Sequence, residues 1–394
     1  MGGGLPHLSF SLTELQSVNV ELELTPAASN DWKVPEIMAT VGPTLEKPED
    51  LQGAIQAGAR WFRLPCGYRQ RPHLENSRSV RNASRLAGVP VHLLLDLPSS
   101  RPRTGTMPEA KLTVGQKALF WDSEDGGVPP AQNGILHVPL PGLSALIRKL
   151  KACHRMWFCD GRLSFVIEEL QPRSVLARME KGTIPLKSSN SIFLPDSPSP
   201  FTVMTPQDRA LLDSFRAENL IPDWIALSLV GSAEDVVCAR LEAREHLKAE
   251  TKIMAKFETE QALTCIEEII NAADGIMVAR GDLGLAVGYI RLPEAQEQLV
   301  AAARRAGKPV VVATQALEIF AETGLPQRAE LSDLSLIARQ RADAVMLGKE
   351  TVFSPRPIEC IRFAAEMMTH ETRRFEKAAR LDAPKPRRRR QVSK

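Results

Sequence analysis

The stretch DGIMVARGDLG, residues 274–284, is a buried apolar strand pattern that runs into a glycine-punctuated turn carrying Asp282. Just before it, KIMAKFE (252–258) is a second apolar strand pattern, which ends in Lys256 and Glu258. These two residues stand two positions apart, so both side chains project from one face of the strand. Carboxylates at neighbouring strand ends suit a hard divalent cation such as Mg²⁺, which prefers oxygen ligands and leaves positions open for a phosphate or carboxylate substrate. The two segments predict a metal site with Lys256 beside the metal.

Similar short, continuous apolar runs recur along the chain, as buried parallel strands require. Helical patterns separate them, for example at residues 47–57 and 74–87. Eight such βα units predict an α/β protein built as a TIM (β/α)8 barrel, whose active site forms at the carboxyl ends of the strands. The predicted strands are residues 36–41, 60–65, 91–96, 224–229, 252–257, 275–279, 309–313 and 343–347.

The barrel pattern is interrupted between residues 106 and 205, where β-branched and turn residues are more frequent. Within this segment, WFCDGRLSFVIEEL (157–170) is typical of a hairpin around Asp160-Gly161. We therefore predict an inserted small β-rich domain at 106–205. The predicted domains are an N-terminal extension at 1–32, a barrel at 33–105 and 206–372, the insert, and a basic tail at 373–394.

The composition is that of an ordinary globular protein, with 394 residues, 43% hydrophobic and 25% charged. The net charge is only +3, and the basic run Lys385–Arg390 is read as a solvated terminus, so a nucleic-acid partner is not expected. Six cysteines without CxxC spacing favour reduced thiols over a disulfide framework or a zinc site. No run approaches the ~20 apolar residues of a membrane span and no signal-peptide pattern opens the chain, so the cytoplasm is the expected compartment.

Nine ordered sequence blocks run along the chain from about Glu36 to Met368: IMATVGP (37–43), AGARWFRL (57–64), LLLDLPSSRPRTG (93–105), DWIALSLVGSAEDV (223–236), KIMAKFE (252–258), DGIMVARGDLG (274–284), AGKPVVVATQALE (306–318), RAELSD (328–333) and DAVMLGKET (343–351). Through these blocks the chain resembles the pyruvate kinase family. The resemblance implies a barrel with a small cap domain that closes over the active site. It also implies phosphoryl transfer between phosphoenolpyruvate or pyruvate and ADP or ATP, with Mg²⁺, or Mn²⁺ as an alternative, and a homo-oligomer as one expected assembly. The family's further C-terminal α/β domain, which holds the allosteric site, is expected to be missing.

The resemblance also assigns roles to individual residues. Lys256 stabilises charge on the transferred phosphoryl group and on the enolate, while Glu258 and Asp282 hold the metal. Backbone amides at Gly281 and Asp282 meet the substrate carboxylate. Thr314 touches that carboxylate and helps to relay a proton to the enol carbon. The remaining substrate contacts that it implies are the phosphoryl-binding Arg63 and Arg103 and the serine near the metal, Ser228.

The part of the site that serves the monovalent ion and the nucleotide departs from the family pattern. Where the family has RLNFSHG, the chain has RLPCGYR (63–69), with Pro65, Gly67 and Tyr68 in place of asparagine, serine and histidine. The cation-site carboxylate survives as Asp96, but Leu97 replaces its neighbouring threonine and Arg101 replaces an acidic residue. Family members that work without K⁺ share such changes, so K⁺ is not expected to be required. Lysines that meet nucleotide phosphates align with Asn190 and Phe353.

Three interpretations remain open. The first is a Mg²⁺-dependent phosphotransferase of the pyruvate kinase type, acting on phosphoenolpyruvate or pyruvate and a nucleotide. The second keeps the enolate chemistry in a lyase, aldolase or decarboxylase, or phosphorylates a different acceptor. The third is a non-catalytic ligand-binding relic. Fold alone does not separate them. Pyruvate release that depends on ADP would favour the first, metal-dependent turnover without nucleotide the second, and ligand binding without turnover the third.

Overall fold

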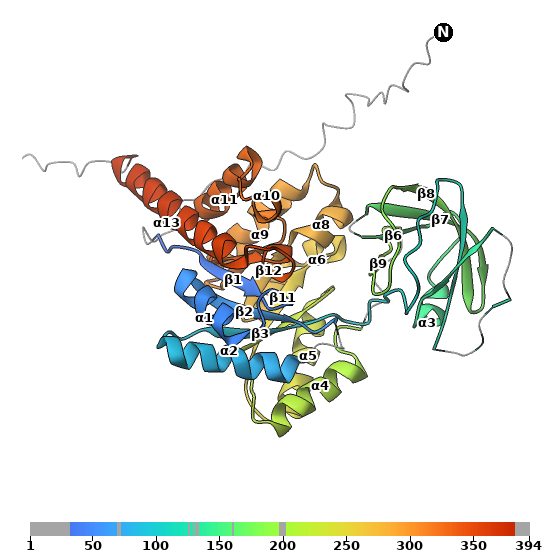
Figure 1. Ribbon diagram of the computed structural model, residues 1–394, viewed down its shortest axis with the longest axis horizontal. Coiled ribbons are helices and arrows are strands. Elements are labelled where there is room, and N and C mark those ends of the chain that lie inside the picture. The colour runs from blue at the N-terminus through green and yellow to red at the C-terminus, as the bar shows by residue number, and fades with distance from the viewer. Residues whose placement is uncertain are drawn as a thin grey trace, which may run out of the picture. The chain divides into compact units, whose positions relative to one another are not determined.

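The computed structural model describes residues 32–68, 72–124, 127, 129–130, 134–159, 161–196 and 202–382 (Figure 1). Eight parallel strands close into a barrel in the order β1-β14-β13-β12-β11-β10-β3-β2, which confirms the predicted TIM barrel. Each strand lies within two residues of its predicted ends. The strands are β1 (Glu36–Thr40), β2 (Ala59–Pro65), β3 (His92–Leu97), β10 (Trp224–Leu227), β11 (Lys252–Phe257), β12 (Gly275–Ala279), β13 (Val310–Ala313) and β14 (Ala344–Leu347).

Alternate residues of these strands build two layers of core. Met38 points into the barrel, where it packs among inward side chains such as Trp61, Met254 and Met346. Its neighbours Ile37 and Ala39 belong to the larger cluster between the strands and the helices. Both faces of each strand are therefore buried, which explains why the strands are continuous apolar runs rather than alternating ones.

Helices follow the strands around the barrel (Figure 1). α8 begins directly after β12 ends at Ala279, so Asp282 lies in the first turn of that helix. The helices are α1 (Pro48–Ala57), α2 (His73–Ala87), α4 (Pro206–Ala217), α5 (Ala233–Leu247), α6 (Glu260–Thr264), α7 (Ile266–Ala272), α8 (Arg280–Val287), α9 (Leu292–Arg305), α10 (Glu318–Thr323), α11 (Arg328–Gln340), α12 (Lys349–Val352) and α13 (Pro357–Asp382).

The last helix is longer than the sequence pattern suggested. The barrel was predicted to end at residue 372, whereas α13 continues to Asp382. Its extension is tied to α11, because Ser335 Oγ donates to Glu371 Oε2 at 2.5 Å and Arg374 Nη2 donates to Ser335 Oγ at 3.2 Å. Thr372 is also buried. Tertiary contacts therefore extend this helix past the point where its apolar pattern weakens.

Between β3 and α4 the chain forms a second, six-stranded sheet with the order β5-β4-β8-β7-β6-β9. It has its own apolar core, which includes Phe120, Phe158 and Phe165. β6 and β7 pair antiparallel, as the predicted hairpin requires. The elements of this insert are β4 (Lys117–Trp121), β5 (Leu136–Pro139), α3 (Leu143–Ile147), β6 (Arg155–Phe158), β7 (Leu163–Gln171), β8 (Ser174–Gly182) and β9 (Ile192–Phe193).

Some predicted features lie outside the described residues. They are the extension up to residue 31, Arg69, the hairpin residue Asp160 and the basic run Lys385–Arg390. Among the helices that the structure does describe, none combines the length and the apolar character that a membrane span needs.

Candidate active site

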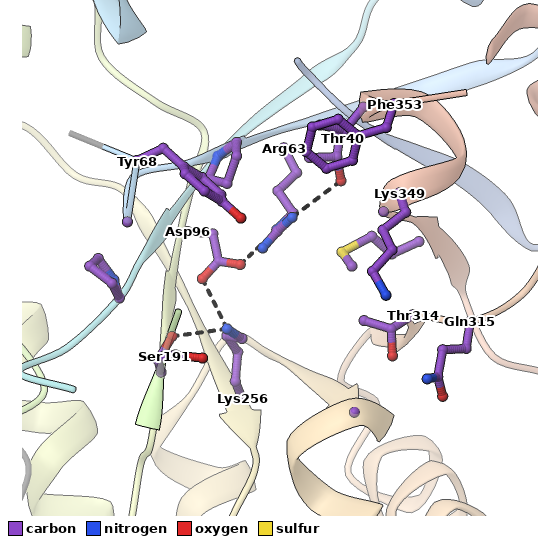
Figure 2. Close-up of a pocket in the computed structure, with 18 of the residues that line it drawn as sticks. Thr40, Arg63, Tyr68, Asp96, Ser191, Lys256, Thr314, Gln315, Lys349 and Phe353 are labelled. Atoms are coloured by element: carbon purple, nitrogen blue, oxygen red, sulfur yellow. Dashed lines mark hydrogen bonds and ion pairs between the residues drawn. The ribbon is translucent and has the colours of Figure 1, made fainter. Parts of the chain in front are cut away.

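A cavity of about 280 Å³ opens at the carboxyl ends of the barrel strands, where the fold leads one to expect a site (Figure 2). Side chains from several separate strands and from the loops after them line it. The structure thus brings together residues as far apart in the chain as Thr40 and Phe353. The predicted site residues in its lining are Arg63, Asp96, Arg103, Ser228, Lys256, Gly281 and Thr314.

Lys256 lies near the end of β11 and is only 8% exposed. Its ammonium donates to Asp96 Oδ1 at 3.0 Å and to Ser228 Oγ at 2.9 Å, and it pairs with Glu258 Oε1 at 2.9 Å. Burial by itself would lower the pKa of Lys256, but the charges of Asp96 and Glu258 raise it above its ordinary value. The pocket therefore holds a fixed positive charge at neutral pH.

Asp96, at the end of β3, joins Lys256 to Arg63 on β2 (Figure 2). Arg63 Nε donates to Asp96 Oδ2 at 2.6 Å, and Arg63 Nη1 donates to Thr40 Oγ1 at 3.3 Å. Burial alone would raise the pKa of Asp96, yet the charges of Lys256 and Arg63 hold it below its ordinary value. Both oxygens of this carboxylate are therefore engaged by cations.

The two predicted metal ligands face one cationic side chain, Arg101. Its Nη1 donates to Asp282 Oδ1 at 2.8 Å, while its Nη2 lies 3.9 Å from Glu258 Oε2. Glu258 Oε2 also accepts the backbone N–H of Leu229 at 2.8 Å. Burial raises the pKa of Glu258. Burial would do the same to Asp282, but Arg101 and Lys256 outweigh it and lower that pKa.

Thr314 follows the end of β13 in a strained conformation, with φ at +74°, and Gln315 has φ at +56°. Arg280 holds this turn: its Nε donates to the Thr314 carbonyl at 3.1 Å, and its Nη1 contacts the Asp333 carboxylate at 2.6 and 2.7 Å. The Thr314 hydroxyl oxygen is buried and has no hydrogen-bond partner among the described residues. A Cβ added at Gly281 would come within 3.7 Å of it, so the start of α8 adjoins this hydroxyl.

The same cavity contains a further cation, Lys349, which was not among the predicted site residues. Lys349 lies in its lining, two residues beyond the end of β14, and pairs with Glu318 Oε1 at 3.3 Å. Phe353, which aligns with a family lysine, lines the cavity with 62% of its surface exposed (Figure 2). The signal for Lys349 was its place just after a barrel strand, where functional residues gather.

Two other positions have structural contacts of their own. The side chain of Asn190 accepts the backbone N–H of Lys187 at 2.8 Å, and the Asn190 N–H donates to Thr104 Oγ1 at 2.9 Å. Arg103 lies over the Tyr68 ring, with 5.7 Å between its guanidinium carbon and the ring centroid. Its Nη1 donates to the Ser189 carbonyl at 3.1 Å. Burial lowers the pKa of Arg103. Arg103 thus remains at the cavity. Asn190 instead links the two chain segments that connect the barrel to the insert, through its bond to Thr104.

Comparison with known proteins gives consistent matches. The family described as pyruvate kinase, barrel domain, matches residues 32–361. The pyruvate kinase of Methylorubrum extorquens is 34% identical over 331 residues, which cover 83% of this chain and 66% of that protein. A pyruvate kinase of Agrobacterium vitis is 32% identical over 337 residues (84% and 68%), and that of Thermococcus litoralis is 31% identical over 335 residues (84% and 68%). The chain spans about two thirds of the length of these relatives.

Proposed function

Because this chain belongs to the pyruvate kinase family, we propose that it is a metal-dependent phosphotransferase that moves a phosphoryl group between phosphoenolpyruvate and a nucleoside diphosphate. The observation that carries the proposal is the position of Lys256, whose ammonium is buried and bound to Asp96, Ser228 and Glu258 in the cavity at the strand ends. Phosphoryl transfer depends mainly on positioning and on charge stabilisation, which such a fixed cation supplies.

The other residues of the cavity would divide the remaining tasks. Arg63 and Arg103 would bind the phosphoryl oxygens, because guanidinium groups pair well with them. The amides at Gly281 and Asp282, at the start of α8, would bind the substrate carboxylate. Thr314, whose buried hydroxyl lies next to Gly281, would then carry a proton to or from the enol carbon. Ser228 would hold Lys256 in place through its hydrogen bond.

Glu258 and Asp282 are the residues that would hold the divalent cation. They fit it because Arg101 approaches both carboxylates, at 2.8 Å from Asp282 and 3.9 Å from Glu258, which places the two close together, and hard carboxylate oxygens are what Mg²⁺ or Mn²⁺ prefers. When bound, the ion would polarise the oxygens of the phosphoryl group and of the enolate. The described residues hold no cluster of three or more acidic, histidine or cysteine ligands, so the substrate or water would complete the coordination.

One observation favours the second candidate, an enolate enzyme that uses no nucleotide. Phe353 exposes an apolar ring in the cavity at the position where a phosphate-binding cation would be expected. Lys349, four residues earlier, brings an ammonium to the same cavity, where it pairs with Glu318 at 3.3 Å. The phosphotransferase remains our first proposal because Lys256, Arg63 and Arg103 together supply the positive charge that phosphoryl transfer needs.

The test is a coupled assay of pyruvate release from phosphoenolpyruvate, with Mg²⁺ and with or without ADP. We expect ADP-dependent turnover that Lys256→Met lowers by at least about a hundredfold, the usual cost of losing one group that stabilises transition-state charge. Lys252→Met is the matched control, because Lys252 lies exposed at the opposite end of the same strand. Turnover that ignores ADP would favour the second candidate. Full activity in Lys256→Met would contradict both.

A further inference from the structure

Arg101 occupies an unusual place between the two carboxylates that would hold the metal. It lies in the connection that follows β3, and its side chain is only 9% exposed. One nitrogen of its guanidinium reaches Asp282 at 2.8 Å, and the other approaches Glu258 at 3.9 Å. A planar fork of this kind is well suited to hold two carboxylates at once. Arg101 therefore links a residue that follows β11 to a residue in the first turn of α8.

The three carboxylates around this position are already matched by cationic side chains, and Arg103 in the same cavity adds a further positive charge. The carboxylates of Asp96, Glu258 and Asp282 contact three cationic side chains, which are Lys256, Arg63 and Arg101. A divalent cation placed against Glu258 and Asp282 would add two positive charges beside a buried guanidinium. Like charges at short range in a poorly hydrated site repel strongly. Either Arg101 moves away or an anion enters with the metal.

We propose that Arg101 is a built-in competitor of the divalent cation, so that the metal binds well only together with an anionic substrate. In the substrate-free protein the guanidinium neutralises Glu258 and Asp282, and it must release at least one of them when the ion arrives. The carboxylate and phosphoryl charges of the substrate then offset the excess of positive charge. This inference rests on the metal site of the proposed function, and it makes Arg101 a positioning residue rather than a catalytic one.

The test measures metal affinity and does not depend on turnover. Binding of Mn²⁺ to the purified protein is followed by electron paramagnetic resonance, without and with oxalate as the anion, for the wild type and for Arg101→Gln. We expect Arg101→Gln without oxalate to bind Mn²⁺ about ten- to a hundredfold more tightly, the gain from removing one charged hydrogen bond that the metal must break. Oxalate should strengthen Mn²⁺ binding more in the wild type than in Arg101→Gln.

Two further variants support the test. Arg178→Gln removes a positive charge from a solvent-exposed pair with Glu168 in the insert and should leave Mn²⁺ binding unchanged. Arg101→Lys keeps the charge but offers only one point of contact, so its affinity should fall between those of wild type and Arg101→Gln; it also serves if Arg101→Gln fails to fold.

The results distinguish competition between Arg101 and the metal from the existence of the metal site itself. Equal or weaker Mn²⁺ binding in Arg101→Gln, in a protein that still binds Mn²⁺ with oxalate, would overturn the competition and leave the metal site standing. Absence of Mn²⁺ binding in every folded variant, even with oxalate, would overturn the inference and the metal site together.

Discussion

At the scale of single residues, the site is organised around one buried ammonium. Lys256 is held by oxygens from three places in the chain: Asp96 at the end of β3, Ser228 just after β10, and Glu258 just after β11. Each of these three side chains also has a second partner: Asp96 accepts from Arg63, Glu258 accepts from the Leu229 N–H, and Ser228 Oγ donates to the Leu97 carbonyl at 2.7 Å. The same three side chains therefore fix both the charge and the position of the Lys256 ammonium. Substitutions at these residues should have different effects on metal binding and on turnover.

Binding experiments should distinguish the proposed metal ligand, Glu258, from Lys256, which is not proposed to bind the metal. Glu258→Gln keeps the size of the side chain and an oxygen for the Leu229 N–H but removes the ligand charge. Its Mn²⁺ affinity in the presence of oxalate should fall by more than the about ten- to hundredfold that loss of an outer-shell partner costs. Lys256→Met should keep Mn²⁺ binding. Calorimetry on both variants checks this, and a Glu258→Gln protein that binds Mn²⁺ normally would remove Glu258 from the site.

Potassium should have no effect on turnover. Both oxygens of Asp96, the carboxylate that a monovalent cation would use, already meet Lys256 and Arg63. Replacing K⁺ by a bulky organic cation at constant ionic strength should leave the rate of pyruvate release unchanged. Strong activation by K⁺ would mean that Asp96 has a different partner in the working enzyme.

At the scale of elements, the turn after β13 is held by a helix on the outside of the barrel. Arg280, 7% exposed at the start of α8, spans from the Thr314 carbonyl to Asp333 on α11. A conformation with positive φ at a threonine persists only when surrounding contacts impose it. The ion pair between Arg280 and Asp333 is therefore expected to position Thr314, although Asp333 does not line the cavity.

Asp333→Ala should loosen this turn. Arg280 would lose a doubly hydrogen-bonded partner while remaining buried, so the free energy of unfolding should fall by about 1.5–3 kcal/mol. Turnover should fall with little change in substrate KM, because Thr314 would lose its position. Urea unfolding and steady-state kinetics measure both effects. Asp213→Ala, which removes a more exposed partner of Arg216 and His246, is the control. An equal loss in the control would show that the effect at Asp333 is not specific.

The sequence predicted the elements better than the contacts between them. The eight strands could be located because each is a run of buried apolar residues between polar connections, as VVVA (310–313) illustrates. Most site residues could be placed because a barrel gathers its strand ends at one rim. The Arg280–Asp333 pair and the fork of Arg101 join residues 53 and 181 positions apart, and only closure of the barrel brings them together. The end of α13 was missed for a similar reason, since α11 holds it.

At the scale of the whole chain, the barrel and the insert have separate apolar cores. The two connections between them run side by side: the Thr104 N–H donates to the Asn190 carbonyl, and the Ser189 N–H donates to the Thr104 carbonyl, each at 2.9 Å. A segment whose ends lie together and whose core is its own behaves as an inserted domain.

The barrel should therefore survive removal of the insert. A variant in which two glycines join Gly105 to Ser189 in place of residues 106–188 should keep a single cooperative thermal transition and a near-ultraviolet circular dichroism signal. The full-length chain measured in parallel is the reference. A broad transition without that signal would show that the barrel needs the insert to fold.

The barrel is closed by its first and last strands, since β1 pairs with β14 and Thr40 exchanges hydrogen bonds with Thr351 across 311 positions. During synthesis on a ribosome, the strand that completes the ring emerges only after nearly all of the barrel has been translated. Until then β1 and β13 each present an unpaired edge, the kind of surface that promotes association with other chains. Newly made copies of this protein should therefore depend on chaperones longer than proteins of the same length that fold in small local units.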